Sequence, residues 1–531
     1  MGNVLRVRAF KNARVYALNP ANGTYARSDG LIVKNGRIGS LSPQDAGAGV
    51  ECVDFEGGTI LPAFSDAHVH LTDTGLLLGP HNLSRTRSYG DFCAAVSRLP
   101  SDAFVMAGNY DESSWADERI ADAAPLERYF ADSFAMLVRV DGHSCIVNRK
   151  TVAWLGLPAQ VEGIERDGRG DPTGKLFLDA NWQAQSKFMA ALPQRLKRKA
   201  EHAATQLALS RGALHLHVQL VGFGRDEYWG EIAALQQLPP AKWYPKICEP
   251  DPSLAKSLQL PYVGGDVFLD GSIGSCTAAV REPYAISVQP SQPPGTGKLR
   301  YSDEEVFRYF HSAEKLGVSA GVHAIGDRAI EQCIATWEAV LKNKPSPRNR
   351  HFIEHFEIAT QDQIERCARL GIMLSMQPAF DLLWGGSGNM YERRLGTQRM
   401  RSMNALGRAL RAGATLCGGD DSPVCDLSPL QGMQACVEHH EPQERLTPDE
   451  ALTMYTHNVA KLGHVEGTTG RLAEGLAADF VVLDKDPLDG ARFGECTVLQ
   501  TWRDGKKVFD LERDVYPSTD PPFDKLRVTS F

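Results

Sequence analysis

The sequence lacks the features that would place the chain in a membrane or on a nucleic acid. No run of 18 apolar residues occurs in its 531 residues, and the opening MGNVLRVRAFKNARVYALNP has no apolar segment of the signal-peptide type. The 57 basic and 65 acidic residues are spread along the chain without a basic block, and the formal net charge is −8. These absences predict no spanning helix, no nucleic-acid partner and no membrane partner.

Paired cysteines are also missing. The 11 cysteines are scattered without a C-x-x-C motif, which is typical of reduced thiols and not of a disulfide framework. At 531 residues and 43% hydrophobic composition, the chain can bury one large core or two moderate ones. We therefore expect a globular, mildly acidic protein of the cytoplasm.

Both ends of the chain read as short strands. Asn35-Gly36, in LIVKNGRIGSL, and Asp504-Gly505, in TVLQTWRDGKKVFD, are hairpin signals between strand-like runs. Two β-rich ends around a different middle predict one small sheet domain built from residues 1–60 and 468–531. Two unrelated terminal hairpins are the alternative.

The middle of the chain, residues 61–467, alternates strand-like runs with helical stretches such as DEEVFRYFHSAEKLG and TQDQIERCARLG. Repeated βα units of this kind predict a parallel sheet, either closed as a barrel or open and doubly wound. The segment from about 72 to 200 is too long for a single connection, so it is predicted to carry an insertion.

Titratable residues gather at the ends of the predicted strands. In LPAFSDAHVHL, His68 and His70 are two positions apart on a strand, so their side chains project to the same face. Neutral imidazoles are good ligands for Zn²⁺, although an isolated H-x-H also fits satisfied or surface histidines. Other strand ends offer further candidates, namely His323 in GVHAIGD, His355 in FIEHFE, and Asp420 and Asp421 in LCGGDDSPV.

The combination of motifs resembles the amidohydrolase superfamily, specifically the branch of N-substituted formamide deformylase-like proteins. The matching stretches occur in the family's order, cover nearly the whole chain and include LPAFSDAHVH, RVDGHSCIVN, FLDGSIGSCTAAVREPY, VHAIGDRAIE, RHFIEHFE, MQP, GDDSPV, ALTMYTHNVAKL and GRLAEGLAADFVVLD. The resemblance implies an α/β fold: a (β/α)₈ TIM-type barrel with a small composite β-sandwich formed by both chain ends.

The resemblance also implies a site and an activity. Its metal ligands would be His68, His70, His323, His355 and Asp421, and Asp421 would carry a proton from the attacking water to the leaving nitrogen. The expected cofactor is a divalent metal of the Zn²⁺ type, with one firmly bound ion. We expect hydrolysis of an amide-type C–N bond in a small molecule, by a homodimer. A deaminase on the same scaffold and a non-catalytic scaffold protein are the alternatives.

One position departs from the family pattern. Many members of this branch carry a lysine, which when carboxylated bridges two metals, where GGDVFLDGS places Asp266. Three interpretations follow. Asp266 acts as a shorter carboxylate bridge or ligand, the site holds a single metal, or Lys246 in YPKIC substitutes from a neighbouring strand. We favour one firmly bound metal with Asp266 near it, and leave a second metal open.

Further residues have both a site and a core interpretation. His143, in VDGHSC, matches a family position that points toward substrate, and a structural hydrogen bond is its alternative. Tyr110 and Trp115, in the predicted insertion, fit either a substrate pocket wall or ordinary core. A second H-x-H, His215 and His217, is interpreted as pocket wall or hydrogen-bonded core in preference to metal ligands.

Overall fold

A computed structural model describes residues 7–47, 50–117, 119–221, 225–286 and 293–514. The described chain forms two compact units, one from its residues up to Asp73 together with Gln194–Phe509, the other from Thr74–Pro193 together with residues 510–514. Among these residues, no helix is both long enough and apolar enough to cross a membrane.

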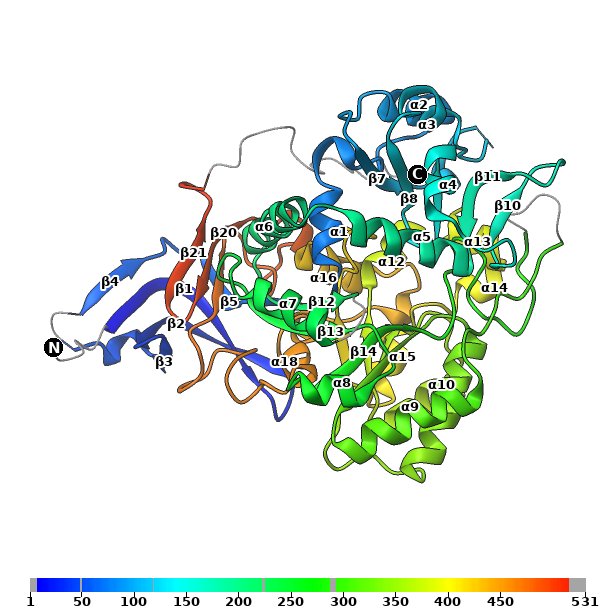
Figure 1. Ribbon diagram of the computed structural model, residues 1–531. Helices are drawn as coiled ribbons and strands as arrows, with labels where there is room; N and C mark the ends of the chain where they lie inside the picture. Colours follow the sequence, from blue (N-terminus) through cyan, green and yellow to red (C-terminus); the bar gives the residue numbers. More distant parts are fainter. Residues whose placement is uncertain (1–6, 48–49, 118, 222–224, 287–292, 515–531) are drawn as a thin grey trace. The chain divides into compact units, whose positions relative to one another are not determined.

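Strands from both ends of the chain share one sheet in the first unit (Figure 1). The eight-stranded sheet has the order β21-β20-β19-β5-β1-β2-β3, with β4 paired to β1. Its strands are β1 (Val7–Asn19), β2 (Thr24–Lys34), β3 (Arg37–Ser40), β4 (Glu51–Asp54), β5 (Thr59–Pro62), β19 (Phe480–Leu483), β20 (Val498–Arg503) and β21 (Lys506–Asp510).

Both predicted hairpins are confirmed. Lys34 pairs with Arg37 across Asn35 and Gly36, whose φ values of 51° and 81° are the positive pair that a tight two-residue turn requires. Asp504 and Gly505 link β20 to β21 with φ values of 48° and 67°. The domain limits predicted at residues 60 and 468 stay predictions.

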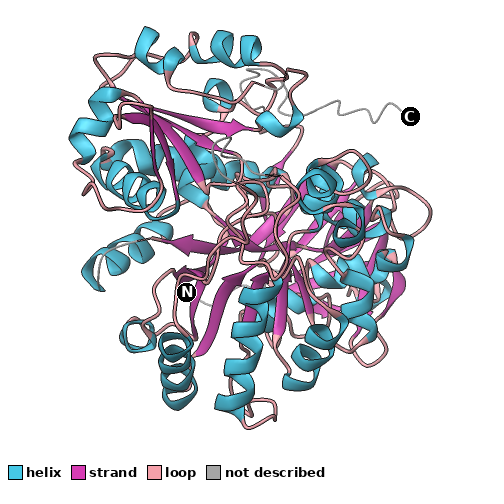
Figure 2. Ribbon diagram, turned by 90° about the vertical axis from the view of Figure 1, so that its right-hand side faces the viewer, coloured by secondary structure: helices cyan, strands magenta, loops and turns pink. Residues whose placement is uncertain are grey.

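Parallel strands form the centre of the first unit, with helices along their outer side (Figure 2). They are arranged as two ladders of three and five strands, with the orders β13-β12-β6 and β14-β15-β16-β17-β18. The strands are β6 (Phe64–Val69), β12 (Ala213–Leu220), β13 (Lys242–Ile247), β14 (Tyr262–Phe268), β15 (Ser319–Ala324), β16 (Phe352–His355), β17 (Met373–Met376) and β18 (Leu416–Gly418). All eight residues of β12 are buried, as expected for a parallel strand covered on both faces.

The two ladders approach closure on one side. After β18 the chain runs beside β6, where the Asp421 N–H donates to His68 O at 2.8 Å and the His70 N–H donates to Ser422 O at 2.9 Å. On the other side, no strand pairing joins β13 to β14 in the part of the chain that the structure describes. The expected barrel is therefore observed as two parallel ladders with one open seam.

The helices of this unit follow the predicted βα alternation. Those expected at DEEVFRYFHSAEKLG and TQDQIERCARLG are confirmed; each begins with a capping box and ends at a glycine with positive φ. The helices are α6 (Gln194–Ser210), α7 (Arg225–Leu235), α8 (Pro252–Ser257), α9 (Asp303–Leu316), α10 (Asp327–Leu341), α11 (Gln361–Leu370), α12 (Pro378–Trp384), α13 (Met390–Leu395), α14 (Thr397–Met400), α15 (Leu406–Arg411), α16 (Pro429–Glu438), α17 (Pro448–Met454) and α18 (His457–Leu462).

The second unit occupies most of the predicted insertion and has its own sheet, of order β10-β11-β9-β8-β7. The strands are β7 (Phe104–Tyr110), β8 (Phe134–Arg139), β9 (Ser144–Val147), β10 (Ile164–Arg166) and β11 (Pro172–Phe177), and the helices are α2 (Tyr89–Val96), α3 (Ala124–Tyr129), α4 (Arg149–Leu155) and α5 (Leu178–Ala191). The short helix α1 (Leu71–Leu76) spans the boundary between the units.

Candidate metal centre

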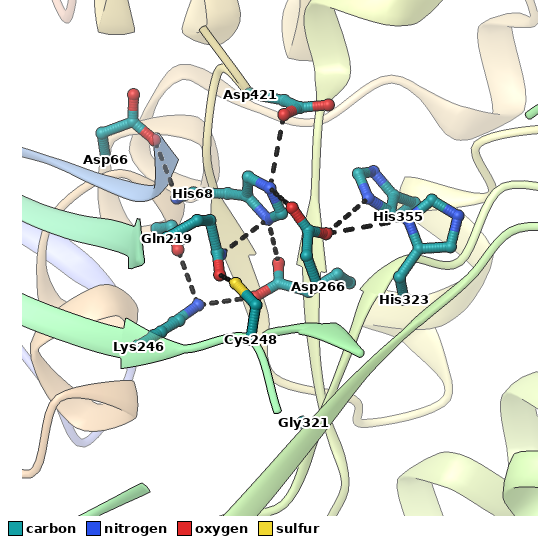
Figure 3. Close-up of polar contacts among 12 residues, drawn as sticks. Asp66, His68, Gln219, Lys246, Cys248, Asp266, Gly321, His323, His355 and Asp421 are labelled. Atoms are coloured by element: carbon teal, nitrogen blue, oxygen red, sulfur yellow. Dashed lines mark hydrogen bonds and ion pairs between the residues drawn. The ribbon is translucent and has the colours of Figure 1, made fainter. Parts of the chain in front are cut away.

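The six residues expected as metal ligands converge at the ends of the parallel strands. Figure 3 labels His68, Asp266, His323, His355 and Asp421 among them. They come from different strands because parallel strands present their carboxyl ends at one edge of the fold. The six are His68 and His70 at the end of β6, Asp266 on β14, His323 on β15, His355 on β16 and Asp421 after β18. The structure therefore brings together these six expected ligands, whereas Asp420 accepts a hydrogen bond from the Ser428 N–H at 2.6 Å and belongs to none of the candidate groups among the described residues.

The first group consists of His68, His70, Asp266 and Asp421. The two imidazole Nε2 atoms lie 3.3 Å apart. Asp266 Oδ2 is 3.2 Å from Nε2 of His68 and 3.1 Å from Nε2 of His70, and Asp421 Oδ1 is 3.3 Å and 3.1 Å from the same two atoms. Four potential ligand atoms thus face one another at nearly equal distances.

These separations suit a shared cation. Two ligands bound at about 2.1 Å to one ion stand about 3.0–3.4 Å apart when the angle between them is about 90–110°. Asp266 Oδ1 and Asp421 Oδ1 are moreover buried acceptors that have only ring nitrogens of the candidate ligands as ion-pair partners among the described residues. Buried carboxylate oxygens without a donor are costly unless positive charge is nearby, so the donor set fits a divalent metal.

The second group contains His323 and His355. His323 Nδ1 lies 3.7 Å and His355 Nε2 lies 3.8 Å from Asp266 Oδ1. The two oxygens of Asp266 therefore face different histidine pairs, Oδ2 the pair on β6 and Oδ1 the pair on β15 and β16. This arrangement corresponds to the first interpretation of Asp266, a short carboxylate shared between two groups of ligands.

In His323 and His355, the ring nitrogen that points away from Asp266 (the outer nitrogen) has a hydrogen-bond partner, which leaves the nitrogen that faces Asp266 (the inner nitrogen) available for a metal. The Nδ1 atom of His355 lies 2.9 Å from Gln377 Oε1, and the Nε2 atom of His323 lies 3.1 Å from the carbonyl oxygen of Gly271. Both partners only accept hydrogen bonds, so they favour the hydrogen on the outer nitrogen and the lone pair on the inner one. The tautomers that result are those that bind metal.

Burial and the neighbouring charges shift the pKa values of the site residues in opposite directions. Burial disfavours protonation of His70, but the carboxylates of Asp266 and Asp421 outweigh it and raise the pKa of His70 to about 10. Burial likewise raises the pKa of Asp421, yet the charge of His68 and contacts with both histidines hold it below the usual value. Asp421 is therefore a carboxylate at neutral pH.

Unusual backbone geometry aims these side chains. His355, Phe356 and Asp421 have φ values of 71°, 52° and 52°, in the left-handed region that non-glycine residues rarely adopt. Successive residues of a strand normally point to opposite faces, but the change of direction at His355 allows Glu354 and His355 both to reach the site. Gly419 lets the chain after β18 pass close to His68, because a Cβ atom at this position would lie 2.8 Å from the backbone nitrogen of His68.

Lys246 does not take the place of the family lysine. Its Nζ atom forms an ion pair with Glu354 Oε1 at 2.5 Å and donates to Ala67 O at 2.8 Å, and its side chain is fully buried. Of the three interpretations, the one that uses Lys246 as a substitute ligand is the least compatible with the structure, because its ammonium group is already committed to a carboxylate.

The second H-x-H belongs to the interior. His215 lies between Tyr244 OH, at 3.2 Å from Nδ1, and Thr469 Oγ1, at 3.2 Å from Nε2, and the His217 ring stacks on Tyr244 with centroids 4.8 Å apart. Burial lowers the pKa of both histidines and favours their neutral forms. This placement agrees with the hydrogen-bonded core interpretation.

The proposed substrate residues all lie in the second unit. Tyr110 is fully buried and Trp115 is buried, and both pack with Phe92 in the hydrophobic core of that unit. His143 is half-buried in the turn between β8 and β9. The packing of Tyr110 and Trp115 favours their core interpretation, and a substrate role for these three residues stays a prediction.

Several residues that support the site were missed by the sequence interpretation. Gln219 Nε2 lies 3.1 Å from His68 Nδ1, and Glu354 Oε2 lies 2.9 Å from the same atom. The alternation on β12 could have revealed Gln219, because it shares a face with His215 and His217. Glu354 precedes His355 directly, and a charged residue in an apolar strand was its only signal.

Comparisons with known proteins show the family to which the chain belongs. A sequence model of the amidohydrolase family matches residues 51–509. The chain is 26% identical to the amidohydrolase YtcJ of Bacillus subtilis (strain 168), over 91% of this chain and 95% of that one. It is 25% identical to N-substituted formamide deformylase of Arthrobacter pascens, with 93% and 96% covered. An uncharacterized metal-dependent hydrolase from Pyrococcus furiosus has the same fold, with a TM-score of 0.70 and 24% identity over 91% of this chain and 100% of that one.

The raised pKa of His70 leads to a testable pH dependence of metal binding. In the metal-free protein His70 carries a proton at pH 7, whereas a metal ion binds only the neutral ring, so binding must release a proton. We expect the apparent affinity for Zn²⁺ to rise with pH between 6 and 8, by up to about tenfold per pH unit for each proton released. Calorimetry in two buffers of different ionisation enthalpy counts the protons.

The control is His202→Gln, which removes an exposed histidine from α6 and should leave the proton count unchanged. An affinity that stays constant from pH 6 to pH 8 would contradict the assignment of His70.

Proposed function

Because the chain belongs to the amidohydrolase family, we propose that it is a metal-dependent hydrolase that cleaves an amide-type C–N bond of a small molecule. The convergence of four histidines and two aspartates at one end of the parallel strands carries this proposal. We propose Zn²⁺ as the metal, because imidazole nitrogen with carboxylate oxygen is a ligand set that Zn²⁺ commonly takes.

The bound metal would activate a water molecule and the substrate carbonyl. His68, His70 and Asp421 would bind the metal, with Asp266 completing the set. A divalent cation bound there lowers the pKa of a water molecule toward about 7 and polarises the substrate carbonyl.

Asp421 is the residue that we propose moves the proton. Its carboxylate is ionised, buried and directed at the two histidines of β6, so it is close to any water held by the same ligands. It would accept the proton of the attacking water and then donate it to the leaving nitrogen as the C–N bond breaks. The left-handed backbone at Asp421 and its N–H bond to His68 O fix the position of this carboxylate.

We further propose that Asp266 serves both groups of ligands. Its Oδ1 atom faces the pair His323 and His355 while its Oδ2 atom faces the pair on β6. A second cation held by His323, His355 and Asp266 would share that carboxylate. Asp266 has a carboxylate of its own, so this assembly would not need the carbon dioxide that converts the family lysine into a bridging carboxylate.

The substrate assay must separate amide hydrolysis from deamination, because both reactions would use the same metal and the same aspartate. We would supply metal-loaded protein with N-formyl, N-acyl and cyclic-amide compounds, and with ring compounds that carry an exocyclic amine. Release of a carboxylate from the amides supports the proposal. Release of ammonia from the ring amines alone would overturn it in favour of a deaminase, and no turnover of any compound by metal-loaded protein would favour a non-catalytic scaffold.

The proton-transfer role predicts the behaviour of Asp421→Asn. The amide keeps the shape and one oxygen for the metal but cannot accept a proton, so kcat should fall by about 10²–10⁴-fold while most of the metal is retained. Metal analysis and steady-state kinetics on the same preparation measure both. Asp362→Asn, an exposed change on α11, is the matched control and should leave kcat unaltered. A kcat close to that of the wild type in Asp421→Asn would exclude the role.

The shared-carboxylate role predicts the behaviour of Asp266→Ala. At saturating Zn²⁺ we expect wild-type protein to approach two equivalents per chain and Asp266→Ala to hold no more than one. We also expect added bicarbonate to have no effect on metal uptake by the wild type. Plasma emission analysis after gel filtration measures the content. Equal metal content in the two proteins, or uptake that depends on bicarbonate, would refute the shared-carboxylate assignment.

A further inference from the structure

We propose that the buried ion pair between Lys246 and Glu354 is a positioning device, which orients His68 and fixes the ring nitrogen that His68 presents to a cation. The inference rests on the proposed metal-dependent function, and it concerns residues that do not themselves touch the reacting atoms. It begins from the observation that this buried charged pair lies beside the ligand cluster, because Glu354 contacts both Lys246 and His68; Figure 3 shows Lys246 next to that cluster.

The pair is isolated from water. The side chains of Lys246 and Glu354 are both 0% exposed, and Lys246 Nζ lies 2.5 Å from Glu354 Oε1 and 4.6 Å from the centre of the Phe352 ring. Burying two charges costs desolvation energy that an apolar pair of similar volume would not cost, so a buried ion pair is weak evidence of a contribution to stability alone. A positional role accounts for its presence here.

The second oxygen of the glutamate reaches a metal ligand. Glu354 Oε2 lies 2.9 Å from Nδ1 of His68, on the side of the ring opposite the ligand cluster. A carboxylate can only accept, so it favours the hydrogen of a neutral His68 on Nδ1. The lone pair is then on Nε2, the atom that faces His70, Asp266 and Asp421.

Lys246 completes a ring of contacts that returns to the same strand. Its Nζ atom also donates to the carbonyl oxygen of Ala67, the residue directly before His68. The contacts thus run from Ala67 on β6 to Lys246 on β13, to Glu354 on β16, and back to His68 on β6. A closed ring of this kind holds the glutamate against movement and holds the β6 backbone at the same time.

Gln219 is a neighbour of this ring. Its Nε2 atom lies 3.1 Å from His68 Nδ1, and its Oε1 atom lies 3.5 Å from Cys248 Sγ. A hydrogen on His68 Nδ1 requires the amide in the opposite orientation, with Oε1 toward the ring, and the two orientations are distinguished only by their hydrogen-bond partners. Gly265 leaves room for it, because a Cβ atom there would lie 2.4 Å from Gln219 Oε1. Gln219 and Glu354 thus both contact His68 Nδ1, and Glu354 is the charged one of the two.

The test compares three variants. In Glu354→Gln the amide oxygen can stay with Lys246 while its N–H group turns toward His68 Nδ1, which would move the imidazole hydrogen to Nε2. We expect the affinity for Zn²⁺, measured by competition with a chelator, to fall by about 10–100-fold. Lys246→Met should also weaken binding, and it leaves Glu354 buried without its partner. The double variant Lys246→Met with Glu354→Gln removes both charges.

The double variant separates positioning from stability. Its metal-free form should unfold at a temperature closer to that of the wild type than Lys246→Met does, since no unpaired charge stays buried. If the pair positions His68, Zn²⁺ affinity in the double variant stays about 10–100-fold below that of the wild type. If the pair matters only for stability, affinity recovers together with the unfolding temperature, and the inference is overturned.

A spectroscopic measurement reports on His68 directly. In Co²⁺-loaded protein, an imidazole that binds through Nε2 has an exchangeable Nδ1–H resonance shifted by the metal. We expect the His68 signal to be present in the wild type and lost or moved in Glu354→Gln. Lys242→Met removes another lysine ion pair of the same strand, that with Asp479, and is the matched control; affinity and spectrum should not change.

Failure of this inference can be told from failure of the proposed function. Wild-type protein that binds neither Zn²⁺ nor Co²⁺ would overturn the proposed metal dependence itself. Wild-type protein that binds metal, together with a Glu354→Gln variant of unchanged affinity and spectrum, would overturn the positioning role alone.

Discussion

The site depends on positive charge placed between two carboxylates that would otherwise repel each other, because they are held close together away from water. Asp266 and Asp421 each place an oxygen within 3.3 Å of the same two imidazole nitrogens, in a part of the molecule that is almost wholly buried. Such an arrangement is unfavourable unless positive charge lies among the four atoms, supplied by protons on the histidines or by a cation. Metal binding and protonation are therefore alternatives at this site, and the remaining features serve to hold the ligands in place.

The ligand histidines are held by surrounding groups that accept hydrogen bonds from their ring nitrogens. Gln377 and the carbonyl of Gly271 face the outer nitrogens of His355 and His323, and Glu354 faces that of His68. Each favours the tautomer whose lone pair faces the ligand cluster, with the hydrogen on Nδ1 in His355 and His68 and on Nε2 in His323. Catalysis would require this agreement, because one histidine in the wrong tautomer would direct a hydrogen at the cation.

Sequence patterns were sufficient for the parts of this organisation that follow a simple period. Same-face spacing predicted that His68 and His70 point together. The strand ends offered His323, His355 and Asp421 as candidates, and the resemblance to the amidohydrolase superfamily implied that they join the first two as ligands. The period failed at Glu354, because the positive φ at His355 allows two successive residues to reach the interior. Tertiary packing decided the position of Tyr110, where an aromatic residue in an insertion fits core and pocket equally in sequence. The partner of Lys246 was also beyond prediction, since it lies 108 positions away on another strand.

The open seam between β13 and β14 has a mechanical consequence for the fold. Backbone hydrogen bonds stop there, so along that edge the ladder of three strands and the ladder of five are not joined by strand pairing. Lys246 belongs to the shorter ladder and Glu354 to the longer one, and their ion pair links the two through the middle. The ion pair is thus a connection between the two ladders that does not depend on backbone hydrogen bonds. Because neither Lys246 nor Glu354 is a ligand of the cation, we expect this connection between the ladders to be present with and without the metal.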